Sequence, residues 1–264
     1  MATYTHGHGD EVLRAYRRRT AENSAGYLLR VLRPGLDLLD VGCGPGSITV
    51  DLAARVAPGR VLGVDVASAP LEQARELAAR AGVQAEFRVG DVYALEADDG
   101  SFDVVHAHQV LQHLTDPVAA LREMARVCRP GGVIAVRDVD YGNISWFPEE
   151  PALHRWLTLY DQVMRRNGGE PRAGRRLLSW AHAAGLHDVE PSAGAWCFGT
   201  PEDRQWWARS WADRLTASTF TEQALEHGFA TRAELEEIAA AYLRWAADDD
   251  GWLGMLHGEL LIRL

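Results

Sequence analysis

The chain has 264 residues, a formal net charge of −10 and 47% hydrophobic residues. This length fits one α/β domain with insertions, and the negative charge argues against nucleic-acid binding, because phosphate contacts need a basic surface. No apolar run approaches the roughly 18 residues that a membrane span needs, and the N-terminus lacks the apolar core of a signal peptide.

The first segment, residues 1–34, is predicted to form a helical lid. Residues 14–19 form a basic stretch of helical character, which Tyr16 and Tyr27 could anchor. Residues 4–8 either belong to an ordered lid or form a frayed terminus, and we favour the lid.

Residues 38–46 carry the most informative motif, LLDVGCGPG. Its apolar run ends at Asp40, and Gly42, Gly44 and Gly46 follow on alternate positions. This pattern predicts a buried strand, a tight loop and a helix. Glycines let such a loop adopt positive φ and approach a ligand closely, while the helix N-terminus offers unpaired N–H groups. We therefore expect a nucleotide site here.

The glycine spacing narrows the choice of nucleotide. It is G-x-G-x-G, whereas the dinucleotide fingerprint is G-x-G-x-x-G, and this disfavours a nicotinamide dehydrogenase. A phosphate-binding P-loop needs a lysine, but all 27 basic residues of the chain are arginines. Asp40 would repel a pyrophosphate and suits a ligand with a cationic amine or sulfonium.

A second strand is predicted over residues 60–65 and ends at Asp65. This acid lies about 20 residues beyond the glycine loop, which is the spacing expected for a carboxylate that accepts from ribose hydroxyls. Val66 is placed to pack on an adenine face. A helix should follow, with Ser68 as its N-cap and Gly82 as its stop.

Three more strands are predicted over residues 87–92, 101–106 and 133–136, and Asp116-Pro117 should begin the helix between the last two. Strands that alternate with helices indicate parallel βαβ units.

The order of these motifs resembles the class I S-adenosylmethionine-dependent methyltransferases, most nearly the ubiquinone and menaquinone biosynthesis type. The resemblance covers residues 38–139. It implies S-adenosyl-L-methionine as cofactor and an α/β fold: a Rossmann-like, seven-stranded, mostly parallel sheet with an antiparallel last strand and helices on both faces. The cofactor-binding residues that we predict are Arg19, Asp40, Gly42, Cys43, Gly44, Asp65, Val66, Asp91, Val92, His108 and Gln109.

The resemblance also implies particular contacts. Asp91 would accept a hydrogen bond from the adenine amino group, and Val92 would supply a backbone contact. An N-terminal helix closes over the cofactor in similar enzymes, so Arg19 could pair with the cofactor carboxylate. The alternative for Arg19 is a solvated basic face.

Beyond the fifth strand, helices are predicted over residues 150–166, 173–184 and 200–248. Strands are expected over 187–196 and 255–264, with the last one antiparallel between the fifth and sixth. The expected plan is a single domain, residues 1–264. Its expected parts, besides the N-terminal lid, are the cofactor-binding core 35–140, helical cap insertions 141–172 and 200–250, and segments 173–199 and 251–264 that complete the sheet.

All nine tryptophans lie at or after Trp146. Indoles offer large apolar faces that suit ligand pockets and cations. We expect some of them to line an acceptor pocket, with Trp146 and Trp207 as the first candidates. The alternative is that the helical insertions use tryptophan for their own core.

The expected chemistry is an in-line displacement at the sulfonium methyl, in which the protein positions the acceptor and excludes water. His106, His108 and His113 are candidates for a base, and His113 is preferred because similar enzymes turn this segment toward the methyl group. His113 could instead bond the cofactor or cap a helix. Tyr141 is a second candidate for orienting the acceptor, and no metal site is expected.

The predicted reaction is methyl transfer to a small-molecule acceptor, favoured by the resemblance as carbon methylation of an aromatic, quinone or indole-like natural product. O- or N-methylation stays open, as does a cyclase that binds the cofactor without transferring its methyl group. The three cysteines, Cys43, Cys128 and Cys197, show no metal spacing and favour a reducing, cytoplasmic compartment. The sequence leaves a homodimer open.

Overall fold

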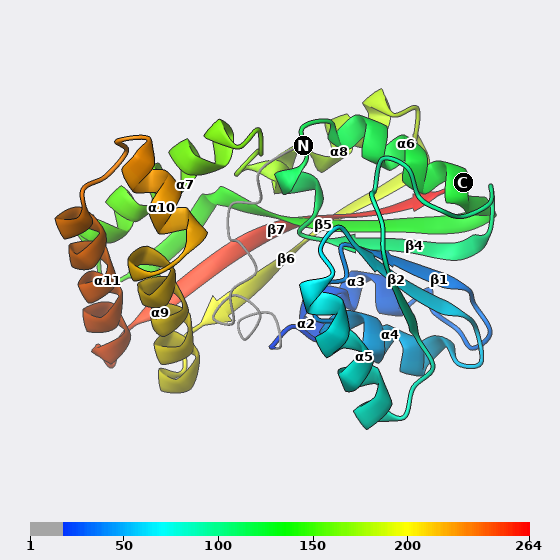
Figure 1. Ribbon diagram of the computed structural model, residues 1–264, viewed down its shortest axis with the longest axis horizontal. Helices are drawn as coiled ribbons and strands as arrows, with labels where there is room; N and C mark the ends of the chain where they lie inside the picture. The colour runs from blue at the N-terminus through cyan, green and yellow to red at the C-terminus, as the bar shows by residue number, and fades with distance from the viewer. Residues whose placement is uncertain (1–17) are drawn as a thin grey trace.

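The computed structural model describes residues 18–264. Seven strands form one sheet in the order β3-β2-β1-β4-β5-β7-β6 (Figure 1). The strands are β1 (Leu38–Val41), β2 (Val61–Asp65), β3 (Glu86–Val89), β4 (Phe102–His108), β5 (Cys128–Phe147), β6 (Val189–Phe198) and β7 (Trp252–Arg263). The pairs among β1 to β5 are parallel, whereas β7 runs antiparallel to both β5 and β6. The predicted Rossmann-like sheet and the place of its antiparallel last strand are confirmed.

Helices cover both faces of the sheet (Figure 1). They are α2 (Ala21–Ser24), α3 (Gly26–Leu29), α4 (Ser47–Val56), α5 (Ala69–Ala81), α6 (Pro117–Val127) and α8 (Leu177–Ala183), with the 3-10 turns η1 (Leu111–His113) and η2 (Ala173–Arg176). Successive strand residues point to opposite faces. Accordingly Leu38 packs in the core with α2, α3 and α4, while Leu39 packs in the core with α6 and α8.

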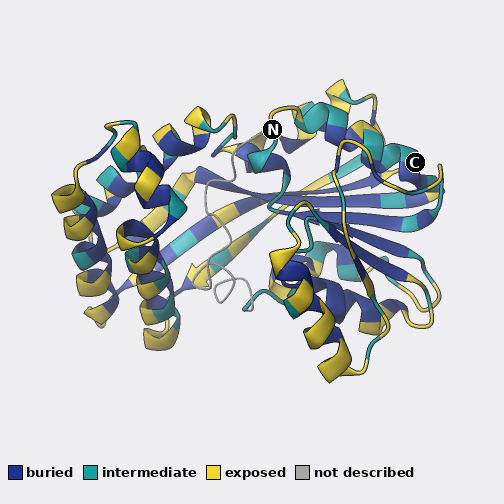
Figure 2. Ribbon diagram, in the orientation of Figure 1, coloured by how far each residue is buried: buried dark blue, intermediate teal, exposed yellow. Residues whose placement is uncertain are grey.

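The remaining helices form what we call the helical layer: α7 (Pro151–Arg166), α9 (Pro201–Thr216), α10 (Thr219–Glu226) and α11 (Arg232–Ala247). They pack around a third core in which Trp156, Tyr160, Trp211 and Tyr242 are fully buried or nearly so. β5, β6 and β7 extend beyond the other four strands and carry this layer (Figure 1). Here β7 pairs with β5 from Ile144 to Phe147 and with β6 as far as Phe198. Figure 2 shows the buried inner sides of these helices and their exposed outer sides.

Several predicted boundaries need correction. The fifth strand is far longer than residues 133–136, because its pairing with β7 continues after a register shift beyond Val139. The single helix expected over 173–184 begins with a 3-10 turn, and the stretch 200–248 forms three helices. Ser68 occupies the N-cap position of α5 but makes no side-chain capping bond, because its φ and ψ are already helical.

Other local predictions are confirmed. Asp116 accepts a hydrogen bond from the Ala119 N–H at the start of α6, and Gly82 ends α5 with φ of 68°. Thr200 caps α9 by accepting from the Asp203 N–H. Residues 4–8 and most of the basic stretch 14–19 lie outside the described residues. Within residues 18–264, no helix has the length and apolar character to cross a membrane.

Candidate functional site

The glycine loop between β1 and α4 forms the floor of a large cavity. Gly42, Gly44 and Gly46 all have positive φ, at 68°, 53° and 77°. A Cβ on Gly42 would lie 2.4 Å from a methyl group of Val110, and one on Gly46 would lie 2.7 Å from the Cβ of Ala74. Conformation and space therefore both require glycine, as the motif predicted.

Two acidic side chains at strand ends line the same cavity. Asp65, at the end of β2, accepts the Gly44 N–H at 2.9 Å and the Ala67 N–H at 3.0 Å. Asp91 accepts the Tyr93 N–H at 2.9 Å. A carboxylate has about four acceptor positions, so each of these groups is fixed by the backbone and keeps capacity for a ligand.

Asp40 also borders the cavity, but its position differs from the expectation. It is only 3% exposed, and its two oxygens accept from His106 Nδ1 at 2.7 Å and Thr49 Oγ1 at 2.5 Å. The carboxylate thereby ties β1 to β4 and to α4. Cys43 lies beside it in the loop, and burial raises the pKa of its thiol well above the usual value, so it is a neutral thiol at pH 7.

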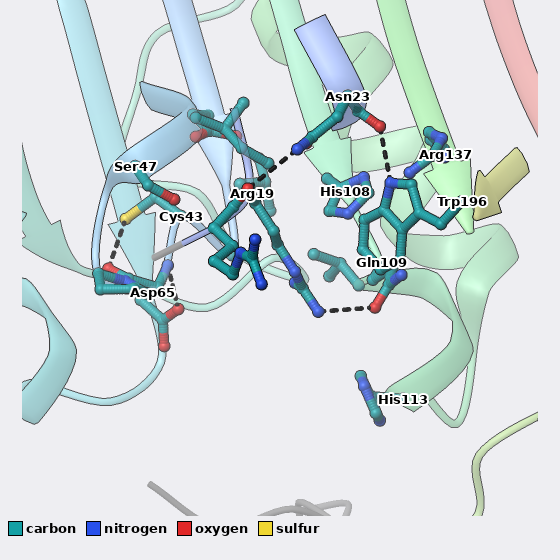
Figure 3. A pocket seen from close by; sticks show the side chains of 18 of the residues that line it. Arg19, Asn23, Cys43, Ser47, Asp65, His108, Gln109, His113, Arg137 and Trp196 are labelled. Atoms are coloured by element: carbon teal, nitrogen blue, oxygen red, sulfur yellow. Dashed lines mark hydrogen bonds between the residues drawn. The ribbon is translucent and has the colours of Figure 1, made fainter. Parts of the chain in front are cut away.

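Gln109, at the end of β4, contacts side chains from two other parts of the chain. It is the one non-glycine residue among those described that has positive φ, 55°. Its Oε1 accepts from Arg19 at 2.9 Å (Figure 3). Its Nε2 lies 3.0 Å from Nε2 of His257 on β7. His257 Nδ1 lies 3.2 Å from the Met255 carbonyl oxygen, so a consistent assignment has Nδ1 protonated and Nε2 accepting from Gln109. Burial lowers the pKa of His257 well below its usual value, which agrees with this neutral ring.

Trp196 on β6 closes this side of the cavity. Its Nε1 donates to the Asn23 carbonyl at 2.7 Å (Figure 3). The guanidinium carbons of Arg19 and Arg137 lie 5.5 Å and 5.1 Å from its ring centroid. Arg137 itself is 2% exposed and pairs with Glu259 at 3.0 Å. Cation–π contacts with these two guanidinium groups therefore help to hold the half-buried indole in place.

The three candidate histidines have different surroundings. His106 is fully buried against Asp40 and does not line the cavity. His108 lines it, with its ring 5.7 Å from the Trp196 ring, and burial lowers its pKa well below the usual value. Within residues 18–264, no group of three or more His, Cys, Asp or Glu residues is arranged to hold a metal ion.

His113, the preferred base, lies on η1 and lines the cavity. Burial, reinforced by the positive charge of Arg19, lowers its pKa from about 6.5 to about 3. The ring is therefore neutral at pH 7 and weakly basic. Asp138 on β5 holds η1 in place by accepting the N–H groups of Leu111 and Gln112 at 3.2 and 3.3 Å.

Besides Trp196, four aromatic side chains from β5, β6 and α9 line the cavity. They are Tyr141, Phe198, Trp206 and Trp207. The ring of Tyr141 also packs 4.1 Å from that of Tyr160. The candidate Trp207 is among the lining residues, but Trp146 is not: it is 8% exposed and packs against His154 in the core of the helical layer.

Sequence reasoning missed Arg137, Trp196, His257 and Arg214 as parts of the site or its support. They share no sequence signal: Arg137 directly follows the predicted fifth strand, Trp196 and His257 lie in predicted strands, and Arg214 lies in a predicted helical insertion. The cavity has a volume of about 1050 Å³.

Comparison with known proteins agrees with this geometry. The family model described as a methyltransferase domain matches residues 32–191. An uncharacterized methyltransferase of Schizosaccharomyces pombe is 33% identical over 98% of the chain and 96% of its own length. The chain belongs to the S-adenosylmethionine-dependent methyltransferases.

One further relative and one solved structure are also similar to this chain. A ubiquinone/menaquinone biosynthesis C-methyltransferase of Bdellovibrio bacteriovorus is 36% identical over 44% of the chain and 49% of its own length. The crystal structure of the YcgJ protein of Bacillus subtilis shares the fold, with a TM-score of 0.58, 20% identity, and 90% of this chain and 97% of that chain covered.

The methyltransferase site suits its cofactor, S-adenosylmethionine. Gly42 and Gly44 line the cavity with backbone and no side chain, and Asp65 and Asp91 offer fixed acceptors. Val66 lines the cavity with 70% of its surface exposed, which is an apolar face of the kind that a base covers.

Proposed function

We propose that this methyltransferase transfers a methyl group from S-adenosylmethionine to a carbon atom of a small aromatic, quinone or indole-like acceptor. One observation carries the proposal: a single cavity is lined both by the nucleotide-site residues and by aromatic side chains of β5, β6 and α9. Donor and acceptor can therefore meet in one largely apolar space from which water is displaced.

On the donor side, we assign Asp65 to the ribose hydroxyls and Asp91 to the adenine amino group. Val66 and Val92 would contact the base. Arg19, held by Gln109, would pair with the cofactor carboxylate. Asp40 holds the loop through Thr49 and His106 and contributes negative potential near the donor.

The bound cofactor supplies a sulfonium methyl group that is already electrophilic. The protein positions the acceptor atom about 3 Å from it and keeps water out. The acceptor gains the methyl group and loses a proton. His113 and Tyr141 line the cavity and are the candidate groups for removing this proton and for orienting the acceptor.

The low pKa of His113 favours one kind of acceptor. A neutral imidazole with a pKa of about 3 is too weak to deprotonate an ordinary phenol, whose pKa is near 10. It is strong enough to take a proton from a ring carbon that has become cationic by accepting a methyl group. This supports carbon methylation of an electron-rich ring over O-methylation that needs a strong base.

The proposal is tested by incubating the protein with labelled S-adenosylmethionine and a panel of hydroxylated quinones, phenols and indoles. We expect labelled product whose methyl group is on ring carbon, as located by mass spectrometry and NMR. Label on oxygen or nitrogen would contradict carbon methylation while leaving methyl transfer intact. Consumption of an acceptor without label would favour a cyclase that retains the cofactor.

A further inference from the structure

Helix α9 presents one face to the cavity. The residues of this face are Asp203, Trp206, Trp207, Ser210 and Arg214, spaced by one, three or four positions. Such spacings lie on one side of an α-helix. The face therefore offers two indoles, then a hydroxyl, and ends in a guanidinium near the C-terminus of the helix.

The guanidinium of Arg214 is buried without a compensating charge. The residue is 6% exposed, and its Nε is buried with no hydrogen-bond partner. In the described chain, no carboxylate lies within ion-pairing distance of Arg214. Its guanidinium carbon lies 5.1 Å from the centroid of the Trp211 ring. A buried charge in this condition is costly unless a partner arrives.

Two other buried arginines have partners within the protein, although Nη1 of Arg137 is, like Nε of Arg214, buried without a hydrogen-bond partner. Arg204, on the same helix and 3% exposed, donates to the Gly199 carbonyl at 2.6 Å and the Gly251 carbonyl at 3.2 Å. Arg137 pairs with Glu259. The chain supplies partners for both, whereas Arg214 faces the cavity and has none of this kind.

The backbone at Arg214 is firmly held. Its carbonyl oxygen accepts from Ser218 Oγ and from Thr221 Oγ1, both at 2.6 Å. The end of α9 is thereby fixed, and the arginine is positioned in advance. The helical layer with α9 lies across the molecule from α4 and the glycine loop (Figure 1). This placement away from the glycine loop favours a group on the acceptor, and not on the nucleotide, as the partner of Arg214.

We propose that Arg214 binds a carboxylate on the acceptor, so that the substrates of this protein are aromatic acids. The inference rests on the proposed methyl transfer and specifies the acceptor class. A guanidinium binds a carboxylate through two parallel hydrogen bonds, which orients the acceptor as well as holding it. Trp207 and Tyr141, which line the same side of the cavity, would contact its ring.

The test uses the protein loaded with S-adenosylhomocysteine and isothermal titration calorimetry. The probes are matched pairs of acid and amide: indole-3-acetate with indole-3-acetamide, 4-hydroxybenzoate with 4-hydroxybenzamide, and cinnamate with cinnamamide. For at least one pair, we expect wild type to bind the acid about tenfold or more tightly than the amide, since hydrogen bonds to charged groups contribute most.

The variants are R214Q, R214K and the control R209Q. Arg209 is exposed on the same helix, so R209Q removes the same charge without touching the cavity. We expect R214Q to bind acid and amide alike, R214K to keep part of the acid preference and R209Q to keep all of it. Because R214Q removes an uncompensated buried charge, its melting temperature should not fall, which separates ligand binding from a structural role.

Two results would overturn the proposal: no acid preference in wild type for any pair, or an undiminished preference in R214Q. Binding of S-adenosylhomocysteine is measured first with the same protein. Its failure in wild type would contradict the proposed function, whereas normal binding without acid preference would contradict the role of Arg214 alone.

Discussion

Arg19 and Gln109 are joined by a hydrogen bond of 2.9 Å, although 90 positions separate them in the chain. This bond ties the segment before β1 to the residue with positive φ at the end of β4. Both side chains line the cavity, and the ring of Trp196 lies beside the guanidinium. The N-terminal segment is thus part of the site wall.

The first prediction concerns Arg19. Replacing it with Gln should weaken binding of S-adenosylhomocysteine by about 10- to 100-fold, because a charge-assisted bond to the carboxylate is lost. Calorimetric titration measures this effect. Arg33→Gln, which changes an exposed arginine outside the cavity, is the matched control and should bind normally. Equal affinities for the two variants would assign Arg19 to a merely solvated face.

The second prediction concerns Gly42. It shares φ of 68° with Gly82, but a Cβ on Gly82 meets nothing within 4 Å. Gly82→Ala should therefore cost about 1 kcal/mol for the left-handed backbone alone. Gly42→Ala adds a clash with Val110 and should lose more stability as well as cofactor affinity. Thermal melts with and without S-adenosylhomocysteine check both, and matching losses would contradict the steric argument.

The third prediction concerns the pH dependence of activity. Since the pKa of His113 is about 3, its ring stays neutral as pH falls from 8 to 5, and kcat/KM should show no acid limb from this residue there. His113→Gln should slow transfer about 100-fold if the ring takes the proton. If kcat/KM of wild type falls below about pH 6.5 and that of His113→Gln does not, the pKa of His113 is close to its usual value.

The fourth prediction concerns stability and the same histidine. In the unfolded chain His113 has a pKa near 6.5, so between about pH 3 and 6.5 the unfolded state binds the extra proton. Stability should therefore decrease as pH falls below 6.5, by roughly 1 kcal/mol at pH 5.5 from this group. Denaturant melts at pH 7.5 and 5.5 should show a smaller decrease for His113→Gln than for wild type. Identical decreases would contradict the lowered pKa.

The fifth prediction separates two tryptophans. Trp207 lines the cavity and Trp146 does not. Trp207→Ala should raise KM for the acceptor while leaving affinity for S-adenosylhomocysteine unchanged, because the acceptor ring loses an apolar face. Trp146→Phe should leave both constants near wild type, since its indole packs in the helical layer. The reverse pattern in steady-state kinetics would place the acceptor elsewhere.

The donor half could be predicted from the sequence because its signals are local. Gly42, Gly44 and Gly46 all have positive φ, which glycine adopts at the least cost, so their spacing alone indicated the loop. Asp65 was predictable in the same way, because parallel strands place their carboxyl ends at one edge of the sheet. The role of Asp40 was harder to predict from the sequence, because its contact with His106 depends on which residues of β1 and β4 are paired.

The sequence by itself therefore determined the fold class, the family and the cofactor. Only the tertiary structure decided how the rest of the site is composed. His257 reaches Gln109 because β7 pairs with β5, and Arg214 meets the cavity because the helical layer packs on the extended ends of those strands. Antiparallel pairing joins segments more than a hundred residues apart, and burial then sets their charge states. No local pattern encodes either effect.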